Sequence, residues 1–149
     1  MRRLLVVSGV LLVVAASGCA GPPQTLPKGK LTNGGKSVLP DRRGGLTMVF
    51  MPDPPTGQTY PAGFNSDDDS FAVYGPQQKG IPQGKYRVTL NMMVPTTTAD
   101  GKDLPEGQKR TLLQNADQFN AKYSEKNSPI VVDVNKSELD IDLAQYQSK

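Results

Sequence analysis

The chain has 149 residues with one cysteine, no histidine and no tryptophan, and its formal net charge at pH 7 is +3. A single cysteine excludes an intramolecular disulfide. Without histidine, the chain lacks the commonest acid–base group at neutral pH and the commonest metal ligand. Its 17 basic residues form no dense cluster, so the sequence predicts no nucleic-acid surface. These observations favour a small domain that is not an enzyme and has no cofactor.

The beginning of the chain is typical of an export signal. Arg2 and Arg3 come first, an apolar stretch runs from Leu4 to Ala16, and small residues lead up to Cys19. A basic start, an apolar middle and a small-residue end define such a signal. The apolar stretch has about 13 residues, whereas a helix that crosses the hydrocarbon core needs roughly 20. We therefore predict that residues 1–18 are a signal peptide.

The end of this signal resembles the lipobox of bacterial lipoproteins. The residues that carry the resemblance are Ala16, Ser17, Gly18 and Cys19, with Ala16 where the family prefers leucine. The resemblance implies a diacylglyceryl group on Cys19, cleavage before it, and acylation of the new amino end, for example with palmitate. Such a lipid would anchor the protein in the bacterial cell envelope, at the outer membrane or the periplasmic face. The alternative is an ordinary secretory signal with an incidental cysteine.

After the signal, the sequence divides into a proline-rich stretch (19–27) and one domain (28–146). The stretch carries three prolines and no periodicity, which is typical of a tether between a membrane and a domain. Arg2 and Arg3 leave with the signal, which brings the 17 basic residues of the full chain close in number to the 14 acidic ones. The mature protein is therefore nearly neutral.

Alternation of apolar and polar residues predicts an antiparallel β-fold. The clearest case runs from Tyr86 to Val94, where every second residue is apolar, as in a sheet with one buried face. Further strands are predicted over 28–31, 46–51, 59–64, 71–74, 130–134 and 139–143. We interpret Asn135-Lys136-Ser137 as a hairpin turn between the last two. Short strands separated by regular turns predict a seven-stranded antiparallel β-sandwich.

One segment departs from this alternation. Between Gly107 and Ser124 the apolar residues follow helical spacing; they are Leu112, Leu113, Ala116, Phe119 and Tyr123. We predict a short helical insertion of about three turns before the last hairpin, placed to cover an open end or edge of the sheet.

Several motifs resemble carboxypeptidase regulatory-like, transthyretin-like domains. Pro82-Gln83-Gly84-Lys85-Tyr86-Arg87-Val88 resembles their "P-x-G-x-Y-x-V" strand entry, and weaker likenesses occur at Lys30–Leu39, Val49–Pro52 and Asp67–Phe71. The closing part, with Lys122-Tyr123 and Ser128-Pro129, resembles short lipoproteins typical of planctomycete bacteria. The resemblance covers most of 28–143. It implies a prealbumin-like or immunoglobulin-like sandwich without activity of its own, because in carboxypeptidases this module accompanies the catalytic domain.

Three adjacent aspartates, Asp67, Asp68 and Asp69, are a candidate calcium site. Calcium takes about six to eight oxygen ligands from a shaped loop, whereas adjacent side chains point in different directions. The alternative is a solvated loop before the strand that contains Phe71.

Aromatic and sulfur-containing residues supply the remaining candidates. A ligand groove is one interpretation, and core packing the other, for Tyr60, Phe64, Tyr74 and Tyr123. Tyr86 is predicted to be buried with its hydroxyl bonded to a nearby main-chain group, like the tyrosine corner of sandwich folds. Met92 and Met93 are interpreted as a core and a surface residue, because no histidine or cysteine stands by to complete a copper site.

Three functional hypotheses follow. The first is a non-catalytic, membrane-anchored envelope lipoprotein whose β-sandwich is a structural or protein-interaction module. The second is a glycan- or solute-binding module of the envelope, which a structure without a concave aromatic pocket would exclude. The third is a hydrolase that uses a carboxylate pair, as glycosidases do. It is the least favoured, because transthyretin-like hydrolases and zinc carboxypeptidases depend on histidine.

Overall fold

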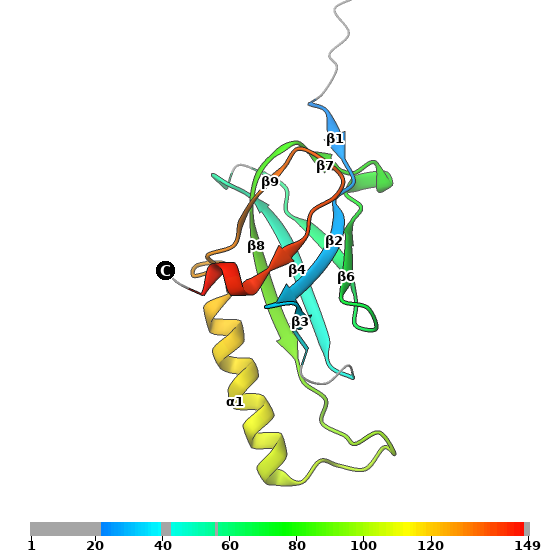
Figure 1. Ribbon diagram of the computed structural model, residues 1–149, viewed down its shortest axis with the longest axis vertical. Helices are drawn as coiled ribbons and strands as arrows, with labels where there is room; N and C mark the ends of the chain where they lie inside the picture. Colours follow the sequence, from blue (N-terminus) through cyan, green and yellow to red (C-terminus); the bar gives the residue numbers. More distant parts are fainter. Residues whose placement is uncertain (1–21, 40–42, 56, 148–149) are drawn as a thin grey trace, which may run out of the picture.

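The computed structural model describes residues 22–39, 43–55 and 57–147. Over these ranges the protein is mostly β-structure with one α-helix, and nearly all strand pairs are antiparallel (Figure 1). The strands are β1 (Gln24–Thr25), β2 (Lys28–Asn33), β3 (Lys36–Ser37), β4 (Gly45–Pro52), β5 (Tyr60–Asn65), β6 (Ser70–Val73), β7 (Ile81–Pro82), β8 (Gly84–Met93), β9 (Val131–Val134) and β10 (Ile141–Asp142). The helix is α1 (Glu106–Lys122), and two short 3-10 turns are η1 (Pro76–Gln78) and η2 (Leu143–Tyr146). The predicted β-rich class is confirmed.

The two longest strands, β4 and β8, are neighbours in the main sheet. They pair antiparallel along the whole of β4, from Gly45 opposite Met93 to Pro52 opposite Tyr86. Every second residue of each strand is buried: Tyr86, Val88, Leu90 and Met92 in β8, and Leu46, Met48 and Phe50 in β4. The alternation predicted for β8 is therefore confirmed, and these side chains form the middle of the core.

The main sheet is strongly curled. Its strands follow the order β10-β2-β6-β5-β4-β8-β9, with β3 paired to β2. β9 ends at Val134, yet the Ser137 carbonyl already accepts a hydrogen bond of 2.8 Å from the Lys28 amide of β2. Three residues reach at most about 11 Å, whereas in a flat sheet five strand spacings would separate β9 from β2 by about 24 Å. The two ends of the sheet must therefore approach each other around the core.

The predicted hairpin between the last two strands is wrong. β9 pairs with β8, whereas β10 pairs in parallel with β2. The turn residues Asn135-Lys136-Ser137 begin a link that arches from β9 across to β2, in orange and red in Figure 1. The Lys28 backbone holds this link, because its N–H donates to Ser137 and its carbonyl accepts from the Leu139 amide at 2.9 Å. The link thus connects the two ends of the curled sheet.

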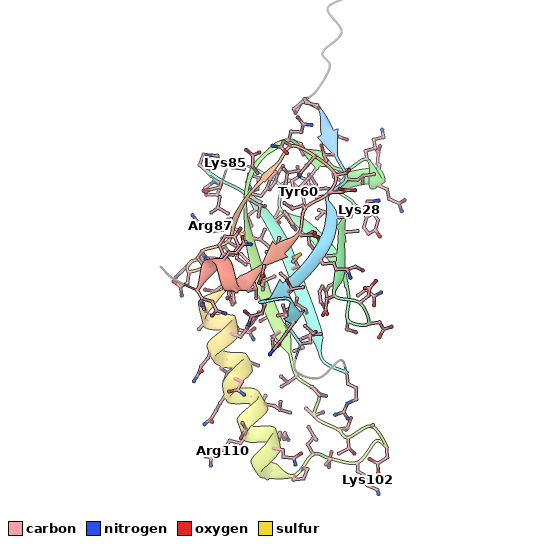
Figure 2. The ribbon with its side chains drawn as sticks, in the orientation of Figure 1. Lys28, Tyr60, Lys85, Arg87, Lys102 and Arg110 are labelled. Atoms are coloured by element: carbon pink, nitrogen blue, oxygen red, sulfur yellow. The ribbon has the colours of Figure 1, made fainter. Side chains whose placement is uncertain are left out.

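Helix α1 covers an edge of β8, as predicted. It has 17 residues and is longer than the three turns expected; its N-terminal half, with the exposed Arg110, extends beyond the sheet (Figure 2). Near its C-terminal end, Asn120 Oδ1 accepts from the Met92 amide at 2.6 Å, and Asn120 Nδ2 donates to the Met92 carbonyl at 3.0 Å. The Tyr123 carbonyl accepts from the Leu90 amide at 3.0 Å. The Asn120 amide thus takes the place of a neighbouring strand.

Replacing Asn120 with alanine is expected to lower the free energy of unfolding by about 2–4 kcal/mol. The change leaves the amide and the carbonyl of Met92 without their partner, and each unsatisfied backbone group costs about 1–3 kcal/mol. Urea unfolding followed by circular dichroism measures the loss. The control is Asn115→Ala, an exposed position on the same helix, which we expect to be neutral or slightly stabilising. Equal effects of the two substitutions would contradict the role assigned to Asn120.

The end of the predicted tether belongs to the folded body. β1 pairs with β7, and the Pro23 carbonyl accepts a hydrogen bond of 3.0 Å from the Gln83 amide. Pro27 is fully buried, and its carbonyl accepts from the Val73 amide at 2.8 Å. The domain therefore begins near residue 23 and not at residue 28, so any tether is shorter than the predicted 19–27.

Candidate functional site

A groove crosses the outer face of strands β2, β6 and β5. Strand pairing aligns outward-facing residues in two rows: Lys28, Ala72 and Gly63 in one, and Lys30, Ser70 and Asn65 in the other. The residues between them along each strand, such as the buried Phe71, face the core. Both rows have small side chains in the middle and long ones at the β2 end. This contrast in size encloses a hollow of about 700 Å³.

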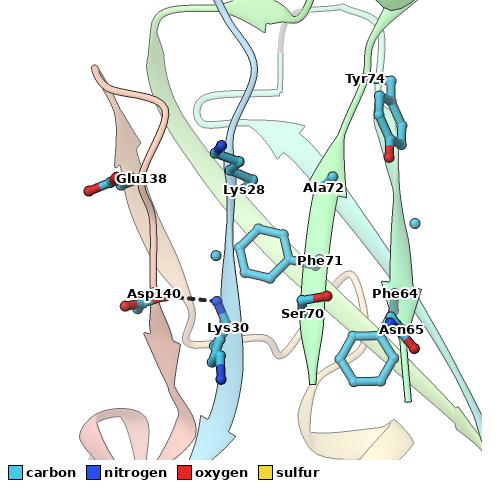
Figure 3. A pocket seen from close by; sticks show the side chains of 12 residues that line it. Lys28, Lys30, Phe64, Asn65, Ser70, Phe71, Ala72, Tyr74, Glu138 and Asp140 are labelled. Carbon is cyan, nitrogen blue, oxygen red and sulfur yellow. Dashed lines mark hydrogen bonds between the residues drawn. The ribbon is translucent and has the colours of Figure 1, made fainter. Parts of the chain in front are cut away.

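The walls of the groove come from segments far apart in the chain. On one side, the link before β10 contributes Glu138 and Asp140, and Asp140 Oδ1 accepts a hydrogen bond of 2.7 Å from the Lys30 amide (Figure 3). On the other side stands Tyr74, whose side chain is 54% exposed. A Cβ placed on Gly63 would lie 3.7 Å from the Tyr74 ring, so this glycine keeps the floor low beside the ring.

Tyr74 and Gly63 also line a second hollow of about 400 Å³. Its other walls include Pro61, Gly75 and Pro76, from β5 and the start of η1. Since Tyr74 and Gly63 line both hollows, the two hollows adjoin at an exposed aromatic residue. We call the two hollows together the Tyr74 groove.

The Tyr74 groove has balanced charge. Lys28 and Lys30 contribute two ammonium groups, and Glu138 and Asp140 contribute two carboxylates. Asn65 adds an amide that donates and accepts hydrogen bonds. The arrangement is suited to binding a polar, uncharged molecule.

The three aspartates of the candidate calcium site serve the turn between β5 and β6. Asp68 Oδ1 accepts from the Ser70 amide at 3.1 Å, Asp69 Oδ1 accepts from the Ser37 hydroxyl at 2.6 Å, and Asn65 Oδ1 accepts from the Asp67 amide at 3.0 Å. The hydrogen bonds from Ser70 hold the pKa of the Asp68 carboxyl below its usual value. Among the described residues no group of three or more acidic side chains is placed to hold a metal ion. This geometry favours the solvated-loop interpretation.

The four candidate aromatic residues do not meet in one groove. Phe64 and Tyr74 line the larger hollow. Tyr60 is buried with its ring 6.1 Å from that of Tyr86, and Tyr123 is buried with its ring 4.7 Å from that of Phe119. Burial raises the pKa of the Tyr123 hydroxyl. Core packing therefore accounts for Tyr60 and Tyr123.

The structural roles predicted for Tyr86 and the two methionines are confirmed. Tyr86 is 3% exposed, and its hydroxyl donates to the Pro82 carbonyl at 2.7 Å. Burial, with a smaller contribution from Tyr60, raises the pKa of Tyr86 to about 12, so the hydroxyl stays protonated at neutral pH. Met92 is buried and Met93 is exposed.

Sequence reasoning found Phe64 and Tyr74 but missed the polar residues of the groove. The sequence pattern predicts Lys28 and Lys30 only as strand residues, and it places Glu138 and Asp140 in a hairpin. The alternation in β2 and β6 signals that Lys30 and Ser70 each point outward. The sequence of either strand alone does not show the pairing that sets these two residues side by side.

The lipobox residues Ala16, Ser17, Gly18 and Cys19 lie outside the described residues. In the part of the chain that the structure describes, no helix is long and apolar enough to cross a membrane. No family model matches the chain, and no curated protein or solved structure is similar to it.

Proposed function

We propose that this chain is a non-catalytic lipoprotein of the bacterial cell envelope whose β-domain is a binding module. The observation that carries the proposal is the sequence pattern of an export signal before Cys19, the one cysteine of the chain. Two or more acyl chains on that residue would form a stable anchor. The domain would stand close to the membrane surface, because the fold already begins near residue 23. The leaflet would be that of the outer membrane or the periplasmic face.

The fold we propose is a variant of the seven-stranded, transthyretin-like sandwich. In its support, the Pro82–Val88 motif opens β8, and the Tyr86 hydroxyl bonds to the main chain four residues earlier. Further support comes from the seven strands that make up the main path of the curled sheet. A module of this kind serves as a structural or protein-interaction unit. The proposal that it is not an enzyme is supported by the absence of histidine from the sequence.

A glycan- or solute-binding role is the second candidate, and the Tyr74 groove favours it. A concave surface with an exposed aromatic ring and a few convergent polar groups is the usual form of a small-ligand site. The groove fits that description, with Tyr74 as its exposed aromatic ring and two lysines and two carboxylates along its sides.

Replacing Cys19 with alanine is expected to move the protein from the membrane fraction to the soluble fraction of the envelope. The substitution removes the sulfur that would carry the diacylglyceryl group. The measurement is fractionation of cells that express wild type or variant, combined with metabolic labelling by an alkyne analogue of palmitate. We expect label in the wild type and none in Cys19→Ala.

The matched control is Ser17→Ala, which keeps a small residue before the cysteine and should leave both labelling and fractionation unchanged. A wild-type protein that is soluble and unlabelled would refute the anchor. So would a Cys19→Ala variant that stays in the membrane fraction as wild type does. Density-gradient separation of the two membranes then assigns the membrane that carries the protein.

A further inference from the structure

We infer that the Tyr74 groove binds a neutral oligosaccharide chain. One sugar ring stacks on Tyr74, and the sugar hydroxyls hydrogen-bond to the polar side chains of the two rows and of Glu138. The inference rests on the proposal that the domain is a binding module, and it is independent of the lipid anchor.

The charges of the groove select against an ionic ligand. An anion would be drawn to Lys28 and Lys30 but would face the carboxylates of Glu138 and Asp140, and a cation would meet the reverse. A hydroxyl group both donates and accepts a hydrogen bond, whereas an ammonium group only donates and a carboxylate only accepts. A ligand rich in hydroxyls therefore satisfies both kinds of group at once.

The Tyr74 ring supplies the apolar part of the site. More than half of its side chain is exposed, and its hydroxyl points along the groove toward the end at Asn65 (Figure 3). Tyrosine combines a flat apolar face with a polar rim, and a sugar ring has the same division between its C–H face and its hydroxyls. A proline-rich peptide also docks on aromatic grooves, but it would leave the charged groups on the opposite side of this groove without partners.

The shape of the groove indicates an extended ligand. The two hollows, of about 700 Å³ and 400 Å³, meet at Tyr74 and Gly63. Each is within the range of about 300–1,000 Å³ typical of ligand pockets. A chain with one ring on Tyr74 therefore has room for neighbouring rings on either side, toward Asn65 and toward Pro76.

The test is isothermal titration calorimetry on the purified full-length protein, in a detergent without a sugar headgroup. The neutral probes are cellohexaose, chitohexaose, mannohexaose, xylohexaose and maltohexaose. Hexagalacturonate serves as the anionic probe and hexaproline as the peptide probe. We expect at least one neutral hexasaccharide to bind, and Tyr74→Ala to weaken its binding about tenfold or more, since tyrosine anchors dominate many interfaces.

A second variant fills the groove without removing the ring. Gly63 lies in β5 without a left-handed conformation, and a Cβ there would meet only ordinary contacts. Gly63→Val therefore should weaken binding about as much as Tyr74→Ala while the domain stays folded, because valine favours strands. Met93→Ala is the control, since Met93 has the same exposed fraction as Tyr74, 54%, and lies outside both hollows.

Loss of binding in Tyr74→Ala and Gly63→Val, with Met93→Ala unchanged, supports the inference. If Tyr74→Ala does not fold, as judged by circular dichroism, Gly63→Val decides alone. The inference fails if none of the neutral probes binds, if both groove variants bind as wild type does, or if hexagalacturonate or hexaproline binds more tightly. None of these outcomes changes the fractionation of Cys19→Ala, so a failure of the groove and a failure of the anchor are distinguishable.

Discussion

Replacing Phe50 with alanine is expected to lower the free energy of unfolding by about 3–5 kcal/mol. Phe50 is fully buried in β4, and its ring centroid lies 6.0 Å from that of Phe71 and 6.3 Å from that of Tyr86. Removing the ring leaves a cavity between two aromatic side chains in the middle of the curled sheet. Natural domains are stable by only about 5–15 kcal/mol, so the variant would lose a large part of its margin. Urea unfolding followed by far-ultraviolet circular dichroism measures the shift in midpoint.

Phe64→Ala is the matched control, because it removes the same side chain from a partly buried position at the edge of the core. Its expected loss is about 1–2 kcal/mol, since Phe64 is already partly exposed. A Phe50→Ala variant no less stable than Phe64→Ala would show that Phe50 is not at the centre of the core.

The strands with the most regular alternation could be predicted from the sequence. In β8, Tyr86, Val88, Leu90 and Met92 all face the core, as their period of two requires. The turn after Asn33 is likewise decided by local chemistry: Gly34 and Gly35 both have positive φ, 61° and 74°, between the paired Asn33 and Lys36. Two such residues favour the tight turn that joins twisted antiparallel strands. Local chemistry decides these features, so a local pattern reveals them.

The pairing of the last two strands could not be predicted, because alternation indicates that a segment is a strand but not which strand it pairs with. A hairpin between 130–134 and 139–143 and a crossing between opposite ends of the sheet have the same local pattern. The outcome depends on the Lys28 backbone, which binds Ser137 and Leu139. It also depends on Asp140, which bonds to the Lys30 amide across a sequence separation of 110 residues. These contacts form only when the two ends of the curled sheet come together, so no local sequence pattern reveals them.

The polar residues of the groove escaped prediction for the same reason. Ala72 and Gly63 look like weak strand residues when each strand is read alone. Once pairing sets them side by side with Lys28, their small size becomes the floor of a groove and the lysine becomes its wall. Tyr74 was a candidate because it is aromatic, but its exposure follows from its position at the end of β6, next to Gly63. Strand pairing therefore turns two residues with weak strand preference into the floor of the groove.

The lack of periodicity in the proline-rich stretch predicts a tether. In the structure the end of this stretch docks on the domain, next to a glycine with a positive φ. Gly80 has a φ of 91°, and a Cβ at this position would overlap the backbone carbonyl of Thr25 in β1. The strand that follows Gly80, β7, pairs with β1, with Gln24 opposite Pro82 and Thr25 opposite Ile81. Close approach of the two backbones thus requires glycine at residue 80.

Replacing Gly80 with alanine is expected to lower the free energy of unfolding by about 2–4 kcal/mol. The positive φ alone costs about 1–2 kcal/mol for a residue with a Cβ, and displacement of β1 removes backbone hydrogen bonds worth about 1 kcal/mol each. Urea unfolding measures the loss. Hydrogen exchange on the full-length protein should show the amides of residues 24–26 exchanging faster in the variant than in wild type, while the amides of β4 and β8 lose only the protection that the lower global stability accounts for.

Two further glycines separate the contributions. Gly34→Ala also places a Cβ at a positive φ, but nothing lies within 4 Å of it, so its loss of about 1–2 kcal/mol measures the conformational cost alone. Gly107→Ala lies in the first turn of α1 in open space and should stabilise the protein by about 0.5–1 kcal/mol. The difference between Gly80→Ala and Gly34→Ala is then the free energy with which β1 docks on β7. If that difference is zero and exchange at 24–26 is unchanged, residues 23–27 do not dock on the domain, and the folded part begins at residue 28 as the sequence predicts.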